Sequence, residues 1–345
     1  MSDSPVSDSA VTPGPHAVAA GGPPATPEPS AGRLPALAKI PNSAALVVFL
    51  ILEIVFFAAN SPYFLNWDNA TNILTAISIT GVLAAGATLL LVSGQFDLSV
   101  GSGVGFVGLL LVELQPHLGT AQAVLVAVAG GVAIGLLNGF LVNVLGINAL
   151  ITTLGTLAIF RGLTLAVGEG QNIAVNGFDW AIARPFLDLP VPALVFVAVA
   201  VVFALIMSFT VYGREMYAIG ANSNAARLVG IRVKRNLFLA FVISGLCMAL
   251  AGLLNTSLIG SSSGTTGTGL ELAAVTAVIL GGTSLQGGTG GVFGTIIGLL
   301  IVGVLSNGLT LMNVDSSWQQ VATGSLLILA VAFDRLRASL LSGLR

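Results

Sequence analysis

The sequence predicts an all-α, polytopic membrane protein with about ten transmembrane helices, some of them broken or re-entrant. Hydrophobic residues make up 55% of the 345 residues and charged residues only 8%, whereas a soluble domain carries about a quarter charged residues. Apolar runs of about 20 residues, the length that crosses a hydrocarbon core of about 30 Å, recur along the chain. Because this composition cannot cover a surface that faces water, the lipid bilayer is the expected solvent.

The first 43 residues differ from the rest and predict a disordered, cytoplasmic tail rich in Pro and Ala. Nine of the fourteen prolines lie there, and the segment contains no apolar run. Such a segment cannot bury enough surface to offset its chain entropy. It also lacks the apolar core of a cleavable signal peptide. The first helix is therefore expected to act as an uncleaved insertion signal.

A transmembrane domain is expected at residues 44–335, followed by a short cytoplasmic tail at 336–345. The third and eighth apolar runs are short and rich in Gly, Ser and Thr, so each is a candidate for a broken or re-entrant segment. In the fourth, Gly131, Gly135 and Gly139 are spaced by four and predict close packing against another helix. The predicted helices are 44–60, 72–93, 98–114, 121–145, 148–168, 193–212, 237–259, 271–286, 292–312 and 318–334.

Basic residues set the expected orientation, because cytoplasmic loops retain Lys and Arg. Ten of the twelve basic residues lie in three clusters: before the first helix, in the 213–236 loop, and at the end of the chain. These three regions, and therefore both termini, are predicted to be cytoplasmic. Six helices are expected between the first two clusters and four between the last two. Both numbers are even, as this topology requires.

Two polar, Gly-rich breaks between apolar runs are the candidate solute path. A carboxylate in a membrane is costly and is a functional candidate by default. Asp97, in the first break, could cap freed backbone amides or could line the path, and the residue pattern leaves both open. The candidate path residues are Gln95, Asp97, Ser99 and Ser102 in the first break and Thr283, Ser284 and Gln286 in the second.

Four other charged residues fall within the predicted helices or next to them. Glu113 and Glu271 lie near helix ends, and Arg161 lies about two turns from one. For these three, we expect the charged heads to extend toward the membrane interface, as long side chains near helix ends commonly do. Glu53 lies in the middle of the first helix and receives no assignment.

Several other classes of function are not expected. The net charge is −2 and no basic block is present, so nucleic acid is an unsuitable partner. Cys247 is the single cysteine, which leaves disulfides and a Cys/His metal site unsupported. Neither lysine, Lys39 or Lys234, follows a glycine, so the chain has no P-loop and ATP would have to be hydrolysed by a partner. No nucleophile or paired-carboxylate constellation indicates an enzyme.

The loop after the sixth predicted helix is the longest basic segment. Its residues predict a short helix that begins with Ser223 or Asn224 as N-cap and ends at Gly230. Charge alone favours a topology anchor for this loop.

Four segments together resemble the permease subunits of bacterial ABC importers of the ribose and xylose type, in the branched-chain amino acid/ribose permease superfamily. The likeness covers residues 44 to 335, and Gln95-Phe96 departs from the Gly-Ile or similar pair that relatives often show. The matching segments are SGQFDLSVGS at 93–102, ALITTLGTLAIFRGL at 149–163, YGREMYAIGANSNAARLVGI at 212–231 and AVILGGTSLQGGTGGVFGTIIGLLIVGVLSNGL at 277–309.

The resemblance implies a homodimeric permease in the bacterial cell (inner) membrane. An extracytoplasmic sugar-binding protein would deliver the solute, and a cytoplasmic ATP-binding subunit would hold ATP and Mg. The chain itself would bind no cofactor. Residues 212–236 would form a cytoplasmic coupling loop that docks on the ATPase. The resemblance therefore favours a docking role for this loop over the role of a topology anchor. The implied coupling residues are Arg214, Asn222, Ala225, Ala226, Arg227 and Gly230.

The expected function is therefore ATP-driven import of a monosaccharide or a similar small polar solute. Ser, Thr, Asn and Gly at the two breaks suit an uncharged, hydroxylated solute better than an ion. The alternative is a secondary transporter driven by a gradient, with Asp97 or Glu271 as a proton or cation site.

Overall fold

The computed structural model describes residues 42–342, which are almost entirely helical. The tail predicted at residues 1–43 lies outside them except for its last two positions. The described residues form twelve α-helices, one short 3-10 helix and one two-stranded antiparallel sheet. The elements are α1 (Asn42–Asn60), α2 (Trp67–Val92), α3 (Val100–Leu118), α4 (Thr120–Asn143), α5 (Ala149–Val167), β1 (Ile173–Ala174), η2 (Trp180–Ile182), α6 (Val191–Phe209), α7 (Val211–Ala221), α8 (Ser223–Leu228), α9 (Val233–Ile259), β2 (Ser261–Ser262), α10 (Leu270–Leu280), α11 (Val292–Leu311) and α12 (Ser316–Ser342).

Six helices in the described part of the chain are long and apolar enough to cross a bilayer, namely α2, α4, α5, α6, α9 and α11. Two others, α1 and α10, contribute shorter apolar stretches at Leu46–Asn60 and Leu270–Leu280. These lengths and compositions make the chain a polytopic membrane protein.

Each of the ten predicted helices has a counterpart, but several bounds needed correction. The eighth was predicted at 271–286, yet α10 ends at Leu280, because two glycines follow and Gly282 has a φ of +87°. The last continues to Ser342, so part of the tail predicted from residue 336 is helical. The prediction missed α7, whose N-cap Thr210 accepts a hydrogen bond from the Gly213 amide at 3.1 Å.

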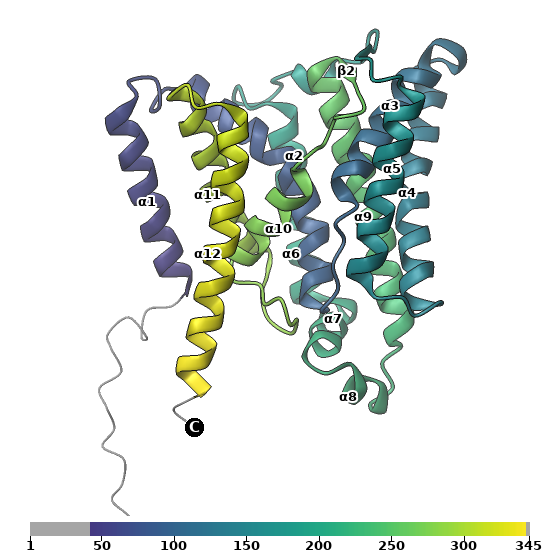
Figure 1. Ribbon diagram of the computed structural model, residues 1–345, viewed down its shortest axis with the longest axis vertical. Helices are drawn as coiled ribbons and strands as arrows, with labels where there is room; N and C mark the ends of the chain where they lie inside the picture. The colour runs from purple at the N-terminus through teal and green to yellow at the C-terminus, as the bar shows by residue number, and fades with distance from the viewer. Residues whose placement is uncertain (1–41, 343–345) are drawn as a thin grey trace, which may run out of the picture. The chain divides into compact units, whose positions relative to one another are not determined.

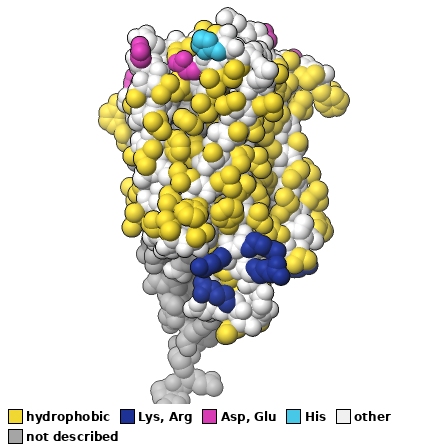
Figure 2. Space-filling view, turned by 90° about the vertical axis from the view of Figure 1, so that its right-hand side faces the viewer, with side chains coloured by type: hydrophobic (Ala, Val, Ile, Leu, Met, Phe, Trp, Pro, Cys, Tyr) yellow, Lys and Arg dark blue, Asp and Glu magenta, His cyan; other side chains and the backbone are white. Residues whose placement is uncertain are grey.

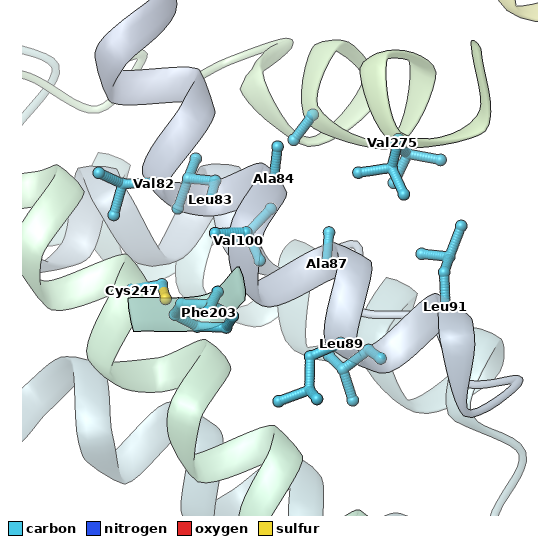
Figure 3. Close-up of a cluster of buried hydrophobic side chains, with 14 of the residues drawn as sticks. Val82, Leu83, Ala84, Ala87, Leu89, Leu91, Val100, Phe203, Cys247 and Val275 are labelled. Carbon is cyan, nitrogen blue, oxygen red and sulfur yellow. The ribbon is translucent and has the colours of Figure 1, made fainter. Parts of the chain in front are cut away.

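The core is organised around α2 and α9, both of which are extensively buried. Figure 3 shows α2 side chains grouped with Phe203 of α6, Cys247 of α9 and Val275 of α10. The close packing predicted at Gly131, Gly135 and Gly139 is confirmed, because a Cβ on Gly135 of α4 would overlap the Phe241 carbonyl of α9. Close approach of two backbones is what small residues allow in membranes. As Figure 1 shows, α1 and α12 lie at one side of this core and α4 and α5 at the opposite side.

Charged side chains are unevenly distributed along the helices. On the face that Figure 2 shows, Lys and Arg side chains gather at one end, whereas Asp, Glu and His side chains lie at the other. The basic residues of the 213–236 loop belong to α7, α8 and the start of α9, which Figure 1 places at the end of the bundle where α2 finishes. The orientation of this end toward the cytoplasm stays a prediction.

Candidate functional site

The first polar break, residues 93–99 between α2 and α3, is held by a buried hydrogen-bond network around Asp97. One carboxylate oxygen, Oδ1, accepts hydrogen bonds from the Ser99 amide at 3.0 Å and the Ser99 hydroxyl at 2.6 Å. The other, Oδ2, accepts one from Ser244 of α9 at 2.8 Å. Asn138 of α4 donates to the Ser99 hydroxyl at 2.9 Å, and Ser102 donates to the Ser99 carbonyl at 2.9 Å. Asp97 therefore ties the break to α4 and α9.

The contacts of Asp97 are those of a structural cap. The residue is 1% exposed, and its carboxylate accepts from backbone and hydroxyl donors. A role of Asp97 in the solute path stays a prediction. Ser99 and Ser102 are also buried. Asn138 and Ser244 were not predicted from the sequence. Each is an isolated polar residue in an apolar helical run, and this pattern could have identified them.

The second break comprises residues 281–291 between α10 and α11, named the glycine loop from here on. Thr283 is buried in it, and the Ser284 hydroxyl accepts a hydrogen bond from the Gln286 amide at 3.2 Å. The Gly288 amide donates to the carbonyl of Val92, the last residue of α2, at 2.8 Å. The fold thus brings the two breaks side by side, although they are far apart in the sequence.

A third non-helical segment, residues 260–269 between α9 and α10, was not predicted as a separate feature. Arg161 of α5 donates from one guanidinium nitrogen to the carbonyls of Gly264 at 3.0 Å and Thr266 at 2.7 Å. Irregular backbone that is shielded from water needs such partners. Arg161 therefore holds this segment, and the expected extension of its head toward the interface stays a prediction.

Glu271, in the first turn of α10, also lies inside the bundle. Its Oε1 accepts a hydrogen bond from the Gly269 amide at 3.2 Å, and its Oε2 is buried against Gly101 of α3. The burial of Oε2 contradicts the expectation that this carboxylate extends to the interface. Glu113 lies in the last turns of α3 and is half-buried, and its role stays a prediction.

A cavity of about 550 Å³ lies among α2, α10, α11 and α12. Its volume falls in the range of about 300–1,000 Å³ that is typical of small-molecule sites. A second cavity of about 250 Å³ adjoins it and shares Ala273, Ser306 and Thr323. Within residues 42–342 no ionisable side chain lines either space. The polar lining of the larger cavity consists of Asn69, Asn72, Thr80, Ser306, Asn307, Thr310 and Thr323.

Amide and hydroxyl groups of this kind can donate to and accept from a neutral polar molecule. Asn69 and Asn307 already exchange two hydrogen bonds, at 3.0 and 2.8 Å, which join α2 to α11 at the cavity wall. None of the seven candidate path residues lines either cavity. Sequence reasoning missed the cavity residues because they are dispersed over four helices and form no local motif.

The predicted short helix in the basic loop is present as α8. Its N-cap is Asn222, whose side chain accepts from the amides of Asn224 and Ala225, both at 3.0 Å, so the cap lies one or two residues earlier than predicted. Gly230, with a φ of +88°, follows the helix as expected.

The exposed face of α8 differs from the one implied by the resemblance. Arg214, Asn222, Ala225, Arg227 and Gly230 are exposed, but Ala226 is only 3% exposed and packs against the chain itself. Ala226 therefore cannot contact another protein in this arrangement. Leu228 and Val229, which are 89% and 78% exposed, were missed, although two apolar residues in a polar loop are a recognisable signal.

Helix α7 is anchored on two sides by tyrosine hydroxyls. Tyr212 donates to the Asn236 carbonyl of α9 at 3.0 Å, and Tyr217 donates to the Gly290 carbonyl of the glycine loop at 2.9 Å. A tyrosine hydroxyl is protonated at neutral pH, and burial raises the pKa of both tyrosines further, so both hydroxyls are donors. The glycine loop is thus in contact with the helix that precedes α8.

Comparison with known proteins places the chain in a family. Residues 69–331 match the family described as "Branched-chain amino acid transport system / permease component". No solved structure shows a significant match.

Three curated relatives illustrate the likeness. The D-allose transport system permease protein of Escherichia coli (strain K12) is 38% identical over 84% of this chain and 90% of its own length. The ribose import permease protein of Bacillus subtilis (strain 168) is 36% identical over 84% and 92%. The L-arabinose transport system permease protein of Escherichia coli (strain K12) is 39% identical over 84% and 89%.

With its apolar helices and these relatives, the chain is a multi-pass inner-membrane protein, and it belongs to the family of permease components of branched-chain amino acid-type ABC transport systems.

Proposed function

We propose that the chain is the permease subunit of an ATP-driven importer that carries a monosaccharide or a similar small hydroxylated solute into the cell. The observation that carries this proposal is the likeness, over 84% of the chain, to permeases named for D-allose, ribose and L-arabinose. The family description names branched-chain amino acids instead. An amino acid is a zwitterion and would need charged partners in a dry site. The neutral lining of the cavity favours a sugar.

The cavity is our proposed solute-binding space in the outer half of the path. Side chains of Asn72, Thr80 and Thr323 offer hydrogen-bonding groups to hydroxyls of a sugar. The predicted path residues remain proposals with a division of roles. Asp97, Ser99 and Ser102 would hold the first break in shape. The partly exposed Gln95 and Ser284 and the exposed Gln286 would be available to a passing solute.

The energy source in this proposal is a separate ATP-binding subunit that holds ATP and Mg, because the chain has no P-loop lysine. We propose that it docks on α8 through Leu228 and Val229, whose exposure leaves them free for a partner. The complex would include a second copy of the chain and an extracytoplasmic sugar-binding protein. Ten membrane spans with both termini in the cytoplasm belong to the same proposal.

Reconstitution in vesicles tests this function against a gradient-driven transporter. The chain, its ATP-binding subunit and its binding protein are combined, and uptake of labelled ribose, D-allose and L-arabinose is measured. Uptake should require ATP, stop with a hydrolysis-deficient ATP-binding subunit, and survive collapse of the proton gradient. Uptake driven by a gradient in vesicles that contain only this chain would refute the proposal and would favour a secondary transporter at Asp97 or Glu271.

A further inference from the structure

The glycine loop lies between the basic end of the bundle and the helices that line the cavity. Figure 1 shows it beside α7, between α10 and α11. Besides the Tyr217 hydrogen bond to Gly290, its backbone packs against α7 with no side chain between them. A Cβ on Gly220 of α7 would lie 2.5 Å from the Gly288 amide nitrogen and would overlap the Val92 carbonyl. Three backbones, those of α7, the loop and the end of α2, therefore meet at Gly220.

Glycine is required on the loop side of this contact as well. Gly288 has a φ of +79°, a left-handed conformation that is costly for residues with a side chain. A Cβ there would lie 3.0 Å from the Ala221 Cα. Contacts between backbones cannot be absorbed by a change of rotamer, because no rotatable side chain separates them. A displacement of α7 must consequently move the loop.

The glycine loop joins two helices, α10 and α11, that pack closely against each other. A Cβ on Gly294 or Gly298 of α11 would overlap the carbonyl of Gly281 or Ala277, at the end of α10. The backbones of α10 and α11 are thus in direct contact. These two helices contribute Leu270, Ala273, Ser306 and Asn307, among others, to the cavity wall.

From these contacts we infer that the glycine loop is a rigid link that carries movement of α7 to the cavity-lining pair α10 and α11, with Tyr217 and Gly220 as positioning residues. The inference rests on the proposed function, since it assumes that an ATP-binding subunit moves α8 and α7. Helix α8 follows α7 after the single residue Asn222, so force applied to Leu228 and Val229 reaches Tyr217 through less than four turns of helix.

The chain offers a matched pair of variants on one helix. Tyr217→Phe removes the hydroxyl that binds the loop, and Tyr212→Phe removes the hydroxyl that binds α9 at nearly the same distance. Both variants are assembled with the ATP-binding subunit and the binding protein, and sugar uptake and ATP hydrolysis are measured together. Tyr217→Phe should lower the number of sugars moved per ATP by about 2–10-fold, the effect of one neutral hydrogen bond. Tyr212→Phe should leave the ratio unchanged.

Equal losses in both variants would show general loosening of α7 and would overturn the inference. So would an unchanged ratio in Tyr217→Phe, or a loss confined to Tyr212→Phe. The ratio is informative because a loss of folded protein lowers both rates and leaves their quotient unchanged.

A second measurement does not depend on the identity of the solute. A cysteine at the exposed Gln286 in the loop is labelled with a maleimide reagent, while the native Cys247 is buried. In the assembled complex, addition of ATP should change the labelling rate, and Tyr217→Phe should abolish that change. An unaltered rate with ATP refutes the link. If the complex hydrolyses ATP but takes up no sugar, the proposed function fails, and the labelling result still decides the inference.

Discussion

Arg161 is predicted to stabilise the fold although it carries a charge into the membrane. Replacement by Met removes the donor of two hydrogen bonds and leaves the carbonyls of Gly264 and Thr266 without it. An unsatisfied buried polar group costs about 1–3 kcal/mol, so the loss should reach about 2–6 kcal/mol for the pair. Removing Arg also makes insertion of α5 easier, by less than the cost of about 3 kcal/mol for an Arg at the centre of a membrane helix. Arg161→Met should therefore reach the membrane in normal amounts and yet unfold more easily.

The assay is the temperature at which half of the detergent-solubilised chain loses its monodisperse elution peak. Arg161→Met should lower this temperature by several degrees, and Arg161→Lys should fall between it and the wild type, since an ammonium keeps the charge without the planar donor geometry. Arg184→Met is the matched control. The Arg184 side chain is 38% exposed, and its Nη1 lies 3.5 Å from Asp188 Oδ2. An exposed ion pair of this kind contributes about 0–1 kcal/mol to stability. Equal unfolding temperatures for Arg161→Met and Arg184→Met would refute the stabilising role of Arg161.

Three further predictions concern the docking helix, the first break and the cavity. Leu228→Asp should abolish ATP-dependent uptake and leave the unfolding temperature unchanged, because Leu228 is exposed. Ala226→Glu should lower the unfolding temperature, because Ala226 is buried. The opposite pattern would refute docking through Leu228. Asp97→Asn should retain transport and stability, but Asp97→Ala should lose both, because Ser99 and Ser244 lose their acceptor, and failure of the Asn variant alone would indicate that the charge is needed. Thr80→Val keeps the side-chain volume and should reduce sugar uptake about 2–10-fold at fixed binding-protein concentration; unchanged uptake would remove Thr80 from the solute site.

Much of the helical framework could be predicted because membrane helices are encoded locally. About 20 apolar residues in succession have few alternatives in lipid, where each backbone group must find a partner within its own segment. The short helix of the basic loop was also predicted from local residues, with its cap placed one or two residues late, whereas the eighth helix was predicted to extend past the glycines that end it. Other predicted helix bounds were wrong where polar residues allow a helix to end at more than one position. The prediction missed α7 and ended α12 too early.

The candidate site divides in the same way. Asp97 was singled out because a carboxylate in an apolar context is conspicuous. The coupling role of the basic loop was inferred from its resemblance to known permeases and stays a proposal. The contacts of Arg161 and Glu271 with residues 264–269 were not predicted, because distance from a helix end does not reveal what lies opposite in space. The burial of Ala226 was not predicted, because the buried side of so short a helix depends on its neighbours.

Composition and the order of apolar runs by themselves determined that this chain is a polytopic membrane protein, that two Gly-rich breaks interrupt it, and that it cannot use a P-loop. These properties depend on residues that are neighbours in the sequence. Only the tertiary structure decided that the two breaks touch, that Asp97 is occupied by Ser99 and Ser244, and that α7 reaches the cavity-lining helices through the glycine loop. Except for the Ser99 hydrogen bond, those contacts join residues far apart along the chain. The backbones of α7, the glycine loop and the end of α2 meet because glycine allows backbones to approach without intervening side chains.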